Sequence, residues 1–146
     1  MRVYLDNCCY NRPFDPQTDL RISLETAAKM RVQALMRASE IEYVWSDALD
    51  YELSQSPNFQ EPDMISPWRI NAIECVVTDD ALIDRGEEIG RMGIKAMDAL
   101  HIASAEVAGC DWFLTTDKGI LKKLQRLGTM RIANPIDFVM EDDEWR

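Results

Sequence analysis

Hydrophobic positions fall into two patterns that follow one another along the chain. The first pattern is a short apolar run that contains β-branched or aromatic residues and is bounded by polar ones. Runs of this length predict buried strands rather than helices. The predicted strands are Arg2–Leu5, Ile41–Trp45, Glu74–Val77, Trp112–Leu114 and Met130–Ala133.

The second pattern places apolar residues three and four positions apart, which predicts amphipathic helices. Lys95–Ala108 is apolar on nearly every side and predicts a central, buried helix, whereas Ser54–Pro67 predicts a loop that leaves room for one helical turn. Ser46 or Asp47 can cap the second predicted helix, and Thr78–Asp80 the fourth. The predicted helices are Asp19–Ser39, a segment from Ala48 through Glu52, Trp68–Ile73, Ala81 to Gly90 or Gly93, Lys95–Ala108 and Lys118–Leu127.

Strands therefore alternate with helices through a chain of 146 residues. This order predicts one α/β domain with a mainly parallel central sheet and helices on both faces. We expect the domain to cover residues 1–140, followed by an acidic C-terminal tail at 141–146. In such sheets, ligands bind beyond the carboxyl ends of the strands, which directs attention to the residues just after each predicted strand.

The formal net charge of −10 and the pI of about 4.5 disfavour a protein that binds nucleic acid by charge alone. The excess carboxylates either keep the protein soluble or gather around metal ions. No run is long enough for a membrane span or a signal peptide, so we expect a cytoplasmic location. The four cysteines form no C-x-x-C pair, which favours buried thiols in a reducing cytosol over a zinc site.

Four acids occupy positions that could carry chemistry. Asp6 directly follows a predicted strand, and Asp117 directly follows the segment Trp112–Thr116, while Asp98 and Glu52 lie on predicted helices. Each acid has a structural alternative: Asp117 as a helix cap, Asp98 as a partner of the helix dipole, Asp6 as an Asx-turn and Glu52 as a surface residue. An ionised carboxylate on an apolar helix is nevertheless costly unless it is paired or binds a cation, and this applies most clearly to Asp98.

Four carboxylates around one cleft would repel one another unless cations lay between them. Hard oxygen ligands select Mg²⁺ or Mn²⁺, and such ions neutralise charge on a phosphodiester. Competing nucleophiles are disfavoured, because Asp6 would raise the pKa of the nearby thiols of Cys8 and Cys9. We interpret His101, the single histidine, as a core residue on the apolar helix.

Three segments resemble the PIN-domain nucleases, a family that includes the toxins of VapBC-type toxin–antitoxin pairs: Leu5–Asn7, Lys95–Ala103 and Phe113–Lys118. The resemblance implies that Asp6, Glu52, Asp98 and Asp117 are the acidic quartet that binds Mg²⁺ or Mn²⁺ and hydrolyses RNA. Asp6, Asp98 and Asp117 would hold the metal, and Glu52 would hold metal or orient the attacking water. Asp47 and Asp50 remain alternatives to Glu52. Thr115 or Thr116 would match the hydroxyl that orders the site.

An acidic protein needs local positive charge to hold RNA. Lys118, Lys122 and Arg126 recur four residues apart on the predicted helix after Asp117, with Lys123 beside them, and Arg12 lies on the loop after Asp6. These residues are either an RNA contact or a solvated helix face. A protomer pair with a shared groove would also ease the charge problem.

Two other functions remain open on the sequence alone. The first is a PIN-like interaction module without catalysis, held by an antitoxin-type peptide. The second is a phosphoryl-transfer domain of receiver or phosphatase type, which is weaker because no D-x-D follows the first predicted strand.

Overall fold

A single six-stranded sheet forms the centre of the molecule. The computed structural model describes residues 1–10, 19–55 and 62–145. The strand order is β3-β2-β1-β4-β6-β5, and all neighbours pair in parallel except β5 and β6. The strands are β1 (Arg2–Leu5), β2 (Glu42–Ser46), β3 (Glu74–Val76), β4 (Trp112–Leu114), β5 (Arg126–Leu127) and β6 (Met130–Ala133).

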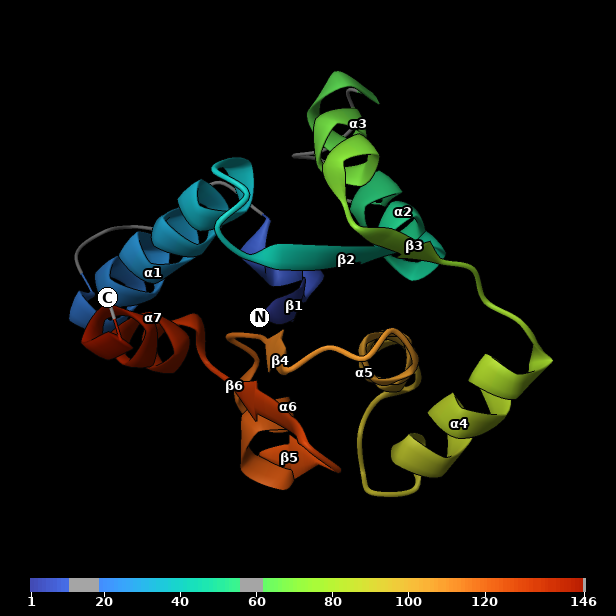
Figure 1. Cartoon of the computed structure of the whole chain (residues 1–146). Coiled ribbons are helices and arrows are strands. Elements are labelled where there is room, and N and C mark those ends of the chain that lie inside the picture. The colour runs from blue at the N-terminus through green and yellow to red at the C-terminus, as the bar shows by residue number, and fades with distance from the viewer. Residues whose placement is uncertain (11–18, 56–61, 146) are drawn as a thin grey trace.

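Helices cover the sheet from two sides (Figure 1). Helices α1 and α7 pack together on one side, and α4 packs against α5 on the other. The helices are the 3-10 turn η1 (Asn7–Cys9), α1 (Leu20–Arg37), α2 (Asp47–Ser54), α3 (Pro62–Asn71), α4 (Asp80–Gly90), α5 (Ala96–Val107), α6 (Lys118–Lys123) and α7 (Pro135–Trp145). The predicted fold class, a mainly parallel α/β sheet with helices on both faces, is confirmed.

Helix α5 is the central helix that its apolar sequence predicts. Ala99, Ile102 and Ala103 on this helix have no exposed surface. The carboxyl ends of β1 and β4 lie side by side, because Leu5 pairs with Leu114 in parallel register and the amide of Asp6 donates to the carbonyl of Leu114 at 2.9 Å. The residues that follow these two strands therefore meet at one edge of the sheet.

The predicted helix Lys118–Leu127 is wrong in its last part. Helix α6 ends at Lys123, Leu124 is extended, and β5 then pairs antiparallel with β6. Gly128 adopts a positive φ of 60°, which suits the two-residue turn between these strands. Sheet pairing has overridden a weak local helical pattern, so Arg126 does not share a helix face with Lys118 and Lys122.

The predicted loop at Ser54–Pro67 is also partly wrong, because α3 begins at Pro62 and contains Pro67. Proline suits the first position of a helix, where no amide donor is needed. Residues 56–61 lie outside the described residues, and so does Arg12 on the predicted loop after Asp6. No helix in the described part of the chain is long and apolar enough to cross a membrane.

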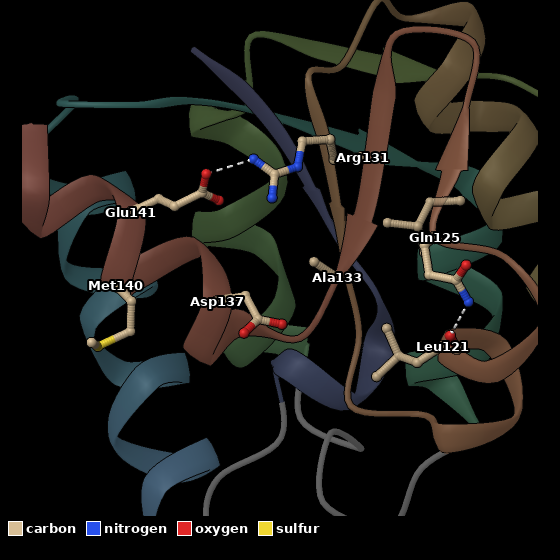
Figure 2. Close-up of a pocket in the computed structure, with 8 residues that line it drawn as sticks. Leu121, Gln125, Arg131, Ala133, Asp137, Met140 and Glu141 are labelled. Carbon is tan, nitrogen blue, oxygen red and sulfur yellow. Dashed lines mark hydrogen bonds and ion pairs between the residues drawn. The ribbon is translucent and has the colours of Figure 1, made fainter.

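Helix α7 was not predicted, although Asn134-Pro135 is a recognisable start signal. Asn134 Oδ1 accepts from the amide of Ile136 at 2.9 Å, and proline follows the cap. Phe138 is 1% exposed and meets the Trp112 ring edge-on, with centroids 5.2 Å apart. Helix α7 continues through Trp145, and its Glu141 pairs with Arg131 at 2.7 Å. Figure 2 shows this pair. The segment expected to be an acidic tail is therefore helical over most of its length.

Replacement of the α7 anchor should test how this helix is held. We expect Phe138→Ala to lower the free energy of unfolding by about 3–5 kcal/mol, because it leaves a cavity beside Trp112. Met140→Ala, on an exposed position of the same helix, should change it by less than about 0.5 kcal/mol. Urea unfolding followed by tryptophan fluorescence measures both, and equal effects would contradict the docking of α7 on the sheet.

Candidate active site

The four acids predicted from the sequence line one pocket at the carboxyl edge of the sheet. Asp6 follows β1, Asp117 follows β4, Glu52 comes from α2 and Asp98 from the first turn of α5. The cavity has a volume of about 430 Å³. Its lining residues are Asp6, Asn7, Cys8, Glu52, Lys95, Met97, Asp98, Thr116 and Asp117.

Asp6 is the most enclosed of the acids, with 2% of its surface exposed. Its Oδ1 accepts from the amide of the next residue, Asn7, at 2.9 Å, and its Oδ2 accepts from Thr115 Oγ1 at 2.8 Å. Thr115 Oγ1 also accepts from the amide of Asp117 at 3.1 Å. The buried Thr115 hydroxyl therefore ties the ends of β1 and β4 together, while Thr116 lines the pocket.

Burial and mutual repulsion work against ionised acids in this pocket. Burial raises the pKa of Asp6 well above its ordinary value, and the charges of Cys8 and Asp98 add to this effect. The pKa of Asp98 is raised by partial burial first, then by the charges of Asp117 and Glu52. A bound cation would offset the burial and the repulsion, since it favours the ionised carboxylates.

Asp117 is a helix cap and a pocket residue at the same time. Its Oδ1 accepts from the amides of Gly119 at 2.7 Å and Ile120 at 3.2 Å, which caps α6. The same side chain lines the acidic pocket. The structural and functional interpretations of this residue are therefore compatible.

Glu52 is the pocket acid of α2, and its neighbours on that helix have other partners. Asp47 accepts from the amide and hydroxyl of Thr78 at 2.8 and 2.7 Å. Asp50 accepts from the Trp45 ring nitrogen at 2.8 Å and lies 3.5 Å from Arg69. Neither residue lines the pocket, so the geometry favours Glu52 among the three candidates.

Two polar residues that sequence reasoning did not assign to the site hold Glu52. Asn7 Nδ2 donates to Glu52 Oε2 at 2.9 Å, and His101 Nε2 lies 2.5 Å from Glu52 Oε1. His101 is fully buried, as a core histidine should be, but it also contacts the candidate site. Among the described residues, ligand atoms of Asp6, Glu52 and His101 all lie within 4.8 Å of one another. The position of His101 three residues after Asp98 was the signal available in the sequence.

The prediction for Cys8 is wrong in direction. Its hydrogen bonds with Cys9 and then Thr116 lower the pKa of Cys8 to about 5, although burial opposes this. The pKa of Cys9 is raised, by the Cys8 hydrogen bond and then by burial. Both cysteines are free thiols, and Cys8 lines the acidic pocket.

Among the described residues, Lys95 is the cation that lines the pocket, and the predicted RNA-contacting set did not include it. Lys95 is exposed and precedes α5 without capping it through its side chain. Lys118 and Lys122 are exposed on α6 but do not belong to the pocket lining. Lys123 Nζ donates to the carbonyl of Gly93 at 2.7 Å. The predicted basic stripe is therefore reduced to the residues on α6.

The fold is similar to that of a solved structure. This structure is VapBC2 from Rickettsia felis, solved bound to a DNA fragment from the VapBC2 promoter. One of its chains matches with a TM-score of 0.56 at 12% sequence identity. The match covers 92% of this chain and 98% of that one, so nearly the whole domain shares its fold. No family model matches this sequence, and neither does any curated protein.

The raised pKa of Asp6 predicts how stability depends on pH without metal. The contribution of Asp6 to the free energy of unfolding is fully present below the ordinary pKa of Asp. It is lost as the pH rises through the raised pKa that Asp6 has in the folded protein. We therefore expect Asp6→Asn to raise Tm at neutral pH in EDTA. In a domain of this size, an increase of about 1 kcal/mol in the free energy of unfolding raises Tm by about 3–6 °C.

Thermal unfolding from mildly acidic to neutral pH would measure this difference. Asp84→Asn makes the same charge change at an exposed position of α4 and is the control. A Tm for Asp6→Asn that stays below the wild-type value at neutral pH would contradict the expected electrostatic cost.

Proposed function

We propose that this protein is a metal-dependent endoribonuclease of PIN type. The observation that carries the proposal is the convergence of Asp6, Glu52, Asp98 and Asp117, from four separate segments, on one pocket. Capping needs or surface solubility alone would not bring these acids together against their mutual repulsion. The fold likeness and the sequence resemblance support the same family.

The donor set of the pocket fits a hard divalent cation. Carboxylate oxygens are the ligands that Mg²⁺ and Mn²⁺ prefer, and the raised pKa values of Asp6 and Asp98 mark charge that lacks compensation. Asp6, Asp98 and Asp117 would hold the ion, and Glu52 would hold metal or orient the attacking water. A bound ion in such a site lowers the pKa of water and neutralises charge on a phosphodiester.

The other pocket residues have supporting roles in this proposal. Thr115 holds the carboxylate of Asp6 and the start of α6 in fixed positions through its hydroxyl. Thr116 lines the pocket and donates to Cys8 Sγ at 3.4 Å. Lys95, which lines the pocket, would contact a phosphate of the RNA backbone, and Lys118 and Lys122 on α6 would be further contacts. The positive charges of these three lysines would hold the RNA backbone next to the acids of the pocket.

The protein also fits the role of a toxin with an antitoxin partner. The structural neighbour belongs to VapBC2, and the sequence resembles the toxin members of such pairs. We propose a cytoplasmic protein that a partner polypeptide holds inactive. A protomer pair that shares an RNA groove remains a prediction.

Metal binding is the first test of the proposed function. Calorimetric titration should show that wild type binds one or two Mn²⁺ ions and that Asp98→Asn binds at least about 100-fold more weakly, since it removes a ligand rather than a supporting group. Asp84→Asn should bind as wild type does, because Asp84 is exposed and outside the pocket.

Loss of Mn²⁺-dependent cleavage of RNA by the same variant would complete the test. Equal Mn²⁺ binding by wild type and Asp98→Asn would reject the site. A folded protein that binds no metal and cleaves no RNA would favour the interaction module instead.

The role of Lys95 is tested by the salt dependence of RNA binding. A 2′-O-methyl oligoribonucleotide resists hydrolysis, so its affinity can be measured with metal present. We expect Lys95→Gln to weaken binding and to reduce the slope of log affinity against log salt by about 0.7–1, as the loss of one phosphate contact does. Arg91→Gln removes an exposed charge outside the pocket lining and should leave the slope nearly unchanged.

A further inference from the structure

A chain of buried polar groups runs from the sheet to the acidic pocket. Tyr4 Oη lies 2.6 Å from Ser46 Oγ and 2.6 Å from His101 Nδ1. The other ring nitrogen of His101 lies 2.5 Å from Glu52 Oε1. Tyr4, Ser46 and His101 are all fully buried, whereas the Glu52 side chain is 23% exposed. The chain therefore begins in the core and ends on a pocket carboxylate.

The direction of these hydrogen bonds follows from the group at the pocket end. The Glu52 carboxylate can only accept, so His101 Nε2 donates to it, and Nδ1 of the neutral ring accepts from the Tyr4 hydroxyl. Tyr4 then accepts from the Ser46 hydroxyl, whose oxygen accepts from the amide of Leu49 at 3.1 Å. Burial raises the pKa of Tyr4 well above its ordinary value, so its hydroxyl keeps the proton that it donates.

With Nδ1 as an acceptor, the ring proton of His101 lies on Nε2 and faces Glu52. We propose that His101 is a positioning residue whose Nε2–H fixes the carboxylate of Glu52 for the metal-dependent reaction, with Tyr4 setting the tautomer. This inference rests on the proposed function of the pocket. Asn7 donates to the second oxygen of Glu52, so both carboxylate oxygens have a donor.

A direct metal–imidazole bond is the competing interpretation of the close group formed by Asp6, Glu52 and His101. A metal ligand needs the lone pair of a ring nitrogen. Nδ1 uses its lone pair for the Tyr4 hydroxyl, and Nε2 carries the proton that meets Glu52. A bare Nε2 would instead place its lone pair 2.5 Å from an ionised oxygen. The hydrogen-bond pattern therefore favours support of the carboxylate over ligation.

The scaffold around His101 is built to hold one orientation. The Tyr4 ring stacks on Phe113 with centroids 5.5 Å apart and an interplanar angle of 13°. Ser46 is the N-cap of α2, the helix that carries Glu52. One buried network thus couples the end of β2, the start of α2 and the middle of α5, and it sets where the Glu52 carboxylate lies.

Nitrogen-15 NMR tests the tautomer without any enzyme assay. His101 is the single histidine of the chain, so its ring signals need no assignment. At mildly alkaline pH we expect a protonated Nε2 and a bare Nδ1, both before and after Mg²⁺ is added. Tyr4→Phe, which removes only the hydroxyl, should shift the Nδ1 signal. A bare Nε2, or protons on both nitrogens, overturns the proposal.

Variants at position 101 test the positioning role. We expect His101→Leu to lower Mn²⁺ affinity or kcat by about 10–100-fold, as loss of a supporting hydrogen bond to a site carboxylate does. His101→Gln carries an amide donor near the Nε2 position and should recover part of this loss, with KM for RNA unchanged. Ser104→Ala removes another buried hydroxyl of α5, which donates to the carbonyl of Leu100, and should act as wild type.

The outcomes separate this inference from the proposed function. If wild type binds Mn²⁺ and cleaves RNA but His101→Leu equals Ser104→Ala, the positioning role is wrong and the nuclease assignment stands. If wild type neither binds Mn²⁺ nor cleaves RNA, the proposed function fails, while NMR still decides whether His101 donates to Glu52. If His101→Leu does not fold, Tyr4→Phe provides the activity test, and we expect a smaller loss of kcat in the same direction.

Discussion

The parallel pairing of β1 with β4 is the constraint on which the candidate site depends. Because Leu5 and Leu114 lie in register, the chain leaves both strands at the same level, and Asp6 comes within hydrogen-bond distance of Thr115. Helix α5 then packs beside this edge with Asp98 in its first turn. A slip of either strand would separate the carboxylates and break the Thr115 link.

The electrostatics of the pocket oppose the stability of the metal-free protein. Asp6 is almost completely buried, and the pKa values of Asp6 and Asp98 are raised because burial and like charges disfavour ionisation. Structural carboxylates are more often placed where a partner stabilises them. An arrangement that concentrates this cost at one pocket is typical of a functional site. Lys95 adds a positive charge to the lining of this pocket in a protein of net charge −10.

The local sequence pattern was sufficient to predict the elements that short-range interactions determine. Short-range interactions determine the strands before Asp6 and Asp117 and the apolar helix α5. They also determine the helix caps formed by Ser46 and Asp79. Prediction failed where distant pairing decided the conformation. Residues 126–127 form a strand instead of the predicted helix because they pair with β6 through backbone hydrogen bonds. Helix α7 forms because Phe138 packs against the Trp112 ring. Neither partner is visible within the segment itself.

The sequence by itself determined the fold class and pointed to Asp6, Asp98 and Asp117, because strand ends and an apolar helix can be recognised from neighbouring residues. The tertiary structure alone decided which of Asp47, Asp50 and Glu52 reaches the pocket, since partners such as Thr78 and Trp45 come from other elements. It also decided that His101 holds Glu52 and that Lys95 lines the pocket. These relations depend on side chains 49 and 43 residues apart (His101 from Glu52, and Lys95 from Glu52), which only the packed sheet and helices bring together.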